Sequence, residues 1–155
     1  MYWNRLVEEE DTTVIDKIRS WLREEEIQEN KIEDNKNEFH ITFWYSKGVK
    51  LEGIVNRDKL TISSPSMIFS DNSKNLLLVN ENSRDELDSL LHQQTANFVF
   101  LYSNDELTNL VGVRIFKDIW ADSLTKTSFF DTIVAVQHSI YLVMIKEREW
   151  IKLRV

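Results

Sequence analysis

The sequence predicts an α+β fold in which an antiparallel curved sheet carries helices on one face. Two observations support this class. Short segments that alternate between apolar and polar residues follow one another across tight turns, as hairpin-linked strands do. Segments with helical periodicity lie outside these runs of strands. The expected element order is helix, three or four strands, helix, two strands, helix, written α-βββ(β)-α-ββ-α.

The N-terminal half begins with an expected amphipathic helix over residues 12–28, where Val14, Ile18 and Leu22 recur at helical spacing. Thr13 followed by Asp16 resembles a capping box at its start. Residues 30–37 are expected to be a solvated loop. Period-two alternation and intervening turns then predict three strands, at residues 38–46, 49–55 and 60–63.

The middle of the chain leaves alternatives open. Residues 66–82 could be strand or loop, and the leucine run at 75–80 favours a buried strand. Ser83 and Glu86 resemble a capping box, which places a helix at about 84–95. Residues 96–102 could be a strand or a continuation of that helix; the bulky side chains from Phe98 to Tyr102 favour a strand. A further strand is expected at 110–116.

The last expected element is a long helix that starts near Thr125 or Thr127 and ends at about Glu149. Between Ile140 and Ile145 this helix is apolar almost all round. A helix of this kind is buried on more than one side. We therefore expect it to pack on the sheet and also on the first helix or on a second subunit.

Composition limits the possible functions. The chain has 155 residues, no cysteine and a net charge of −7. Thiolate metal sites and cysteine nucleophiles are therefore excluded, and the acidic balance argues against a general nucleic-acid binder. No linker divides the chain, so we expect one domain over residues 1–155. The longest apolar stretch is shorter than a membrane span, which predicts a cytoplasmic protein with no membrane contact.

One segment resembles a known family. Residues 119–126 read Ile-Trp-Ala-Asp-Ser-Leu-Thr-Lys, and Phe129, Phe130 and the apolar helix follow. This pattern is similar to that of an uncharacterised archaeal protein family, a domain of unknown function, although Ser123 stands where that family usually has Gly. The family is generally given a type III secretion chaperone-like fold, which the order of elements also resembles. The resemblance implies a homodimer that binds extended segments of partner proteins without catalysis.

Few residues suggest chemistry. No glycine-rich phosphate loop, serine-nucleophile motif or histidine pair with metal spacing is present, so we expect no cofactor and no metal. Asp118 and Asp122 flank Trp120, and together with His138 they are the weak candidates for an acid–base or metal site. A strand end and a helix cap explain the two aspartates more simply. His40, His92 and His138 are each expected to be surface or structural residues.

We therefore expect a non-catalytic interaction protein, a homodimer that binds a polypeptide segment. The alternative is an enzyme with an unrecognised carboxylate/histidine site, hydrolytic in type, that uses Asp118, Asp122 and His138. Nucleic-acid binding through Arg114, Lys117 and Lys126 is the weakest hypothesis. Large aromatic side chains on the strands and the last helix are the candidate contact residues; they are Trp44, Trp120, Phe129, Tyr141 and Trp150.

Overall fold

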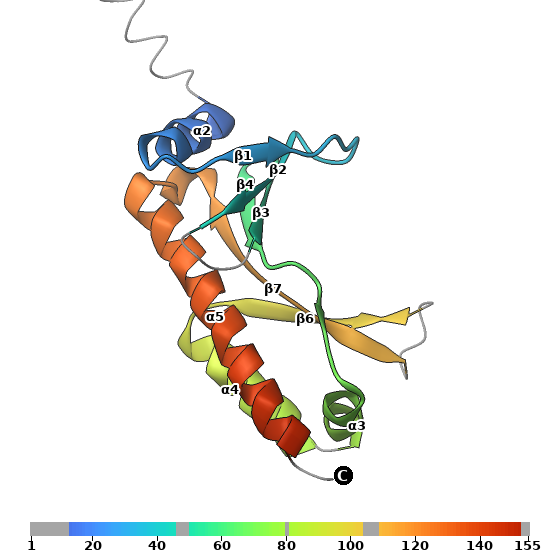
Figure 1. The fold of residues 1–155 in the computed structure, drawn as a ribbon. Coiled ribbons are helices and arrows are strands. Elements are labelled where there is room, and N and C mark those ends of the chain that lie inside the picture. The colour runs from blue at the N-terminus through green and yellow to red at the C-terminus, as the bar shows by residue number, and fades with distance from the viewer. Residues whose placement is uncertain (1–12, 46–49, 80, 104–108, 153–155) are drawn as a thin grey trace, which may run out of the picture.

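The computed structural model describes residues 13–45, 50–79, 81–103 and 109–152. Within these residues, seven antiparallel strands form one curved sheet, and four α-helices accompany it (Figure 1). The strand order is β1-β2-β3-β4-β7-β5, and β6 pairs with β7 as well. The predicted α+β class with an antiparallel sheet is confirmed. The strands are β1 (Glu29–Lys31), β2 (Phe39–Trp44), β3 (Lys50–Asn56), β4 (Lys59–Ser63), β5 (Met67–Ile68), β6 (Asn97–Tyr102) and β7 (Leu110–Trp120).

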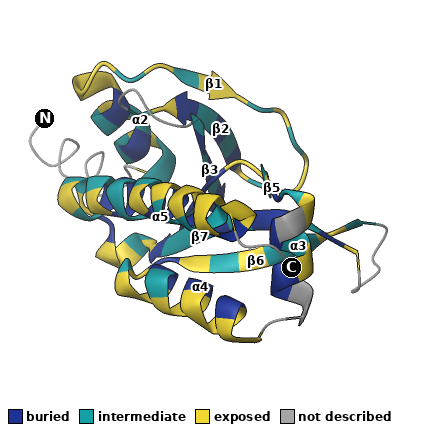
Figure 2. Ribbon diagram, turned by 60° about the horizontal axis from the view of Figure 1, so that its bottom comes forward, coloured by how far each residue is buried: buried dark blue, intermediate teal, exposed yellow. Residues whose placement is uncertain are grey.

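The helices gather on one face of the sheet. They are α2 (Val14–Glu24), α3 (Asp71–Val79), α4 (Glu81–Gln93) and α5 (Lys126–Lys152), with a short 3-10 turn, η2 (Ala121–Ser123), before α5. Helix α5 lies along the sheet, and α2, α3 and α4 each pack against it (Figure 2). In the part of the chain that the structure describes, no helix covers the opposite face, which we call the open face.

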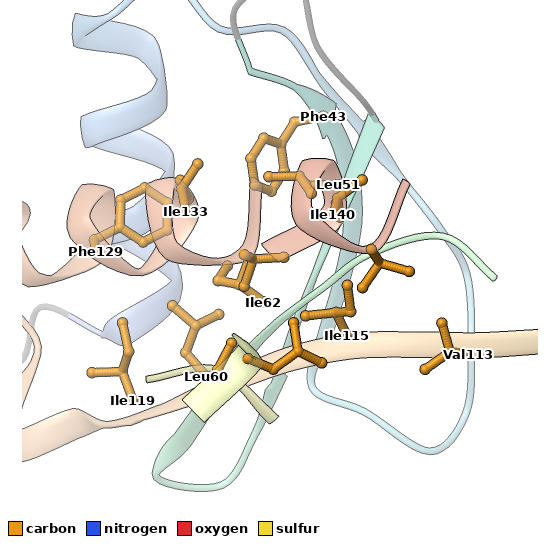
Figure 3. Close-up of a cluster of buried hydrophobic side chains, with 14 of the residues drawn as sticks. Phe43, Leu51, Leu60, Ile62, Val113, Ile115, Ile119, Phe129, Ile133 and Ile140 are labelled. Carbon is orange, nitrogen blue, oxygen red and sulfur yellow. The ribbon is translucent and has the colours of Figure 1, made fainter. Parts of the chain in front are cut away.

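The core lies between α5 and the sheet. Alternate side chains of the central strands are buried, and their neighbours on the open face are partly exposed, as the pleat requires. On the helix side, Phe129, Ile133 and Ile140 of α5 meet Phe43 and Ile62 of the sheet (Figure 3). This packing explains why the apolar stripe of α5 faces the strands.

Local signals correctly predicted most elements. Thr13 accepts a hydrogen bond from the Asp16 backbone N–H at 3.2 Å, so the cap of α2 is confirmed. The strands predicted at 38–46, 49–55 and 60–63 correspond to β2, β3 and β4. Residues 97–102 are a strand, and α5 begins at Lys126 as expected. Strand β7 is longer than predicted because its second half, as far as Trp120, pairs with β4.

The prediction of a buried strand at 75–80 is wrong, because residues 75–79 belong to α3 and residue 80 lies outside the described residues. The Ser70 hydroxyl accepts the Ser73 backbone N–H at 3.3 Å and so satisfies a donor at the start of the helix. The Ser70 backbone N–H donates to the Glu147 carboxylate at 2.8 Å, which ties this helix to α5. The leucine run has no apolar–polar periodicity that would distinguish a helix from a strand. Its helical conformation is therefore determined by the burial of Leu76 and Leu77 against α5 and β7.

Three further predictions are wrong. The expected loop at 30–37 begins inside a strand, because Glu29, Asn30 and Lys31 pair with β2 as an edge strand. The Ser83 cap is also wrong, because α4 begins at Glu81 and Ser83 lies buried within it. Helix α2 ends at Glu24, four residues earlier than predicted, and Glu26 adopts a positive φ of 57° that a helix cannot continue.

Candidate functional site

The exposed side of α5 carries apolar side chains over its C-terminal half. We call this surface the α5 stripe, and it consists of Tyr141, Met144, Ile145 and Ile151. Their spacings of three, four and seven residues place them on neighbouring turns of one side of the helix. Ile145 is 52% exposed, although it follows directly after the core-facing part of the same helix. The sheet, α2, α3 and α4 therefore do not cover every apolar side of α5.

Helix α5 is also long and apolar enough to cross a membrane, judged by length and composition alone. Its residues Phe129, Ile133, Val136 and Ile140 are buried against the sheet and the other helices. A core helix meets the same two criteria. The packing on the sheet accounts for the apolar character of this side, while the side chains of the α5 stripe remain exposed.

A second exposed apolar region follows β6. The strand reads Asn-Phe-Val-Phe-Leu-Tyr. Phe98 and Phe100 turn toward the core, where the centroids of their rings lie 5.2 Å apart. Val99 and Tyr102 are exposed. In the described residues, the backbone of β6 pairs with β7 and with no other strand. We call the side of the strand away from β7 the β6 edge.

The candidate contact residues divide into two groups. Trp44 and Trp120 are 57% and 59% exposed on the open face, and Tyr141 is exposed in the α5 stripe. Phe129 and Trp150 are buried in the core, where Trp150 meets the ring of Phe69 edge-on at 6.4 Å. Phe129 and Trp150 are therefore core residues rather than contact residues, because their side chains fill space between elements.

Trp120 lies beside a surface depression of about 560 Å³. Asp58, Asp122 and Ser123 also line this depression. The ammonium of Lys59 stands 6.0 Å from the centre of the Trp120 ring, at cation–π distance. The depression is open, and among the described residues that line it no histidine accompanies the carboxylates and the Ser123 hydroxyl.

The three weak catalytic candidates do not form one site. Asp118 lies on the open face, where its carboxylate accepts a hydrogen bond from Thr61 at 2.6 Å and approaches Lys59 at 3.7 Å. Asp122 lies in the turn η2 and is exposed. His138 is exposed on α5, which covers the opposite face of the sheet. The hypothesis of an acid–base site built from these residues therefore fails on geometry.

A different ionisable cluster was missed by sequence reasoning. On the open face, the two ring nitrogens of His40 each face a carboxylate: Nδ1 lies 2.7 Å from Asp34, and Nε2 contacts Glu52. Hydrogen bonds from Asn37 and then from His40 hold the pKa of Asp34 well below its usual range. The cluster anchors the segment between β1 and β2 to the sheet.

The basic side chains proposed for nucleic-acid binding are engaged within the chain. Arg114 donates to the Ser66 hydroxyl at 3.0 Å, and Lys117 donates to the Thr95 hydroxyl at 2.7 Å. Lys126 pairs with two carboxylates, those of Glu24 and Glu25, at 2.8 and 3.1 Å. These three cations therefore do not form a free basic patch. Among the described residues, no group of three or more acidic or histidine side chains is arranged to hold a metal ion.

Comparisons with known proteins agree with the sequence resemblance. A model of the family DUF2299, described as an uncharacterized conserved protein, matches residues 14–146. An uncharacterized protein from Methanothermobacter thermautotrophicus has a similar crystal structure, with a TM-score of 0.68, 18% sequence identity, and coverage of 85% of this chain and 94% of that chain. A chain of the ExsC–ExsE complex matches with a TM-score of 0.42, 20% identity, and coverage of 67% and 73%. No curated protein sequence matches significantly.

Proposed function

The chain belongs to the DUF2299 family, and we propose that it is a non-catalytic interaction protein that forms a homodimer and binds a polypeptide segment of a partner. The observation that carries this proposal is the α5 stripe. It exposes Tyr141, Met144, Ile145 and Ile151 on one side of a helix whose other side forms the core. Apolar side chains clustered on a surface mark protein-interaction sites, whereas isolated ones are ordinary.

The chemistry of the surface supports binding rather than catalysis. Asp118, Asp122 and His138 lie apart. In the Asp34–His40–Glu52 cluster, both ring nitrogens of the histidine already contact the two carboxylates. The depression beside Trp120 holds carboxylates and the Ser123 hydroxyl, and no histidine is among the described residues that line it. The resemblance to chaperone-like proteins, which bind extended segments of other chains, supports the same function.

Charge indicates the kind of segment that fits the α5 stripe. Arg148 lies three residues after Ile145 and three before Ile151, so its guanidinium belongs to the same side of the helix. It is exposed, and no described carboxylate lies within ion-pair distance. The α5 stripe therefore combines apolar contact area with the exposed cation of Arg148. The partner that matches it is an apolar segment that carries a carboxylate.

A binding titration tests the α5 stripe directly. The probe is fluorescein-labelled α-lactalbumin that has been reduced and carboxymethylated, which gives an unfolded acidic chain with apolar segments. We expect the wild-type protein to raise the fluorescence anisotropy of the probe. Ile145→Glu places a carboxylate in the stripe, and we expect it to weaken binding by about tenfold or more.

The matched control is Ile68→Glu, which alters an equally exposed isoleucine on β5, away from the α5 stripe. It should bind the probe as the wild type does. Circular dichroism and thermal unfolding verify that both variants fold. A wild-type protein that does not bind the probe, or equal weakening by both substitutions, contradicts the assignment of segment binding to the α5 stripe.

A further inference from the structure

The two sides of β6 differ in how their backbone groups are satisfied. On one side the strand pairs with β7 from Asn97↔Phe116 to Tyr102↔Leu110. On the other side, within the described residues, no strand pairs with it. Backbone N–H and C=O groups of an edge strand that point away from the sheet are a template for another strand.

The β6 edge lacks the features that normally prevent such pairing. Edge strands are commonly short, or carry charged side chains or proline. Strand β6 has six residues, no charged side chain and no proline. From Phe98 to Tyr102 every residue is apolar or aromatic and favours extended structure. Val99, at the middle of the strand, is 47% exposed, so this composition is not explained by burial within one chain.

We propose that the β6 edge pairs antiparallel with the β6 edge of a second copy of the chain, so that the two sheets join across a two-fold axis. This inference rests on the proposed function, which includes a homodimer, and it specifies which surface forms the dimer interface. In a two-fold contact the same surface meets itself, so the surface must be compatible with its own copy. Because β6 carries no charge, antiparallel self-pairing brings no like charges together in any register.

The faces of the strand also match in such a pair. Residues directly opposite each other in an antiparallel pair lie on the same face of a sheet. Val99 and Leu101 would therefore meet their counterparts on the open face. Phe98 and Phe100 would meet theirs on the helix side, where their rings already form an apolar surface. Cross-strand pairs of aromatic and β-branched residues stabilise sheets.

The shape of the molecule leaves space for this contact. Figure 1 shows the distal part of the β6–β7 hairpin extending beyond α4 and α5. A second hairpin can therefore approach the β6 edge along this part without displacing either helix. The opposite terminal strand, β1, has only three residues, Glu29, Asn30 and Lys31, and two of them are charged. Charge and length therefore favour β6 over β1 as the pairing edge.

Cross-linking tests the interface in a chain that has no native cysteine. Val99→Cys places one thiol on the β6 edge, and Lys31→Cys places one on the β1 edge as the matched control. Each variant is treated with a short bis-maleimide, and its mass in solution is measured by light scattering. We expect both variants to have twice the chain mass in solution, and only Val99→Cys to be cross-linked into covalent dimers.

The outcomes separate this inference from the proposed function. A dimer that cross-links at Lys31, or at neither position, overturns the β6 interface and leaves the homodimer standing. A monomer at all concentrations overturns both the interface and the homodimer. A monomer whose binding of unfolded α-lactalbumin is lost in Val99→Lys would assign the β6 edge to a partner segment and would contradict the inference.

Substitution of the same residue provides a second readout. Val99→Lys adds a charge of the kind that protects edge strands, and the exposed position lets the side chain reach water without unfolding the strand. We expect the dimer dissociation constant to rise by about tenfold or more. Val99→Thr keeps a β-branched, uncharged side chain and should leave the constant nearly unchanged. Equal constants for the two variants would overturn the inference.

Discussion

The two terminal strands of the sheet differ in length and charge. Strand β1 spans only Glu29–Lys31, and Arg19 of α2 pairs with Glu29 at 2.8 Å. Strand β6 spans Asn97–Tyr102 and carries no charge. The β1 edge is thus short, charged and held by a neighbouring helix, whereas the β6 edge is longer and apolar.

This contrast shows that the sheet does not leave both of its terminal strands available for pairing with another chain. Protection is present at one edge, so its absence at the other indicates a specific use for that edge. The α5 stripe leads to a similar conclusion for the helical layer, because one side of α5 is core and the other remains exposed. Substitutions at the support of β6, at the anchoring of β1 and at the contact between α2 and α5 should have successively smaller effects.

The largest expected effect comes from Gly112, which pairs with Leu101 of β6 and lies against β5. A Cβ at this position would collide with the backbone carbonyl of Met67, which cannot move aside as a flexible side chain can. We expect Gly112→Ala to destabilise the fold by on the order of 3 kcal/mol and to displace the strands that support the β6 edge. Denaturant unfolding measures this loss.

Gly53→Ala is the matched control, because it adds the same methyl group to a buried strand glycine. The new Cβ would meet the side chain of Ile41 at 3.4 Å, which is close to ordinary van der Waals contact. Its unfolding midpoint should fall by much less than that of Gly112→Ala. Equal falls in the unfolding midpoint for the two variants would show that the closeness of the Met67 backbone to Gly112 is not the cause of the destabilisation.

A moderate, pH-dependent effect is expected at Asp34, in the segment that follows β1. Its carboxylate accepts backbone N–H groups of Lys36 and Asn37 at 2.7 and 3.0 Å and also contacts His40. The side-chain hydrogen bond from Asn37, and then those from His40 and the backbone, lower the pKa of Asp34 in the folded state, so its ionised form stabilises the fold. The contribution is fully present above the ordinary carboxyl pKa of about 3.9 and is lost as pH falls through the lower folded value.

Asp34→Asn removes this contribution while keeping a similar shape. Its melting temperature should lie below that of the wild type at pH 6, and the gap should narrow as pH falls below about 4. Melting temperatures measured from pH 6 to pH 3 check this expectation. A gap that does not change over this range would show that the charge of Asp34 does not contribute to stability.

The smallest effect is expected at the contact between α2 and α5. Lys126 bridges Glu24 and Glu25, and these hydrogen bonds and charges raise the pKa of Lys126 and lower the pKa of Glu24. All three groups are exposed to solvent, which screens the interaction. Lys126→Met should lower the melting temperature slightly at low salt and not at high salt. A large fall in melting temperature that persists at high salt would contradict the interpretation of this contact as a surface ion pair.

Local patterns predicted the parts of the fold that depend on neighbouring residues. The alternation through Phe39, Ile41 and Phe43 reports the pleat of β2, and Thr13 caps its own helix turn. The apolar residues 140–145 also indicated that α5 offers a second contact side besides the one on the sheet. Each of these features is encoded within a few turns or one strand, where periodicity is informative.

Features that depend on distant contacts could not be predicted. Leu76 and Leu77 of α3 are helical because α5 and β7 bury them, and Glu147 is 77 residues away from the Ser70 backbone that it holds. The cluster around His40 needs the pairing of β2 with β3 to bring Glu52 close. Trp150 is a core residue because Phe69 packs on it. None of these contacts leaves a local pattern.

Amide hydrogen exchange tests the central claim most directly, because it compares the two terminal strands in one sample. If two copies pair through β6, the outward N–H groups of residues 97–102 should exchange more slowly as protein concentration rises. The amides of Glu29–Lys31 should exchange at the same rate at every concentration. Exchange at β6 that is as fast as at β1 and independent of concentration would contradict the account.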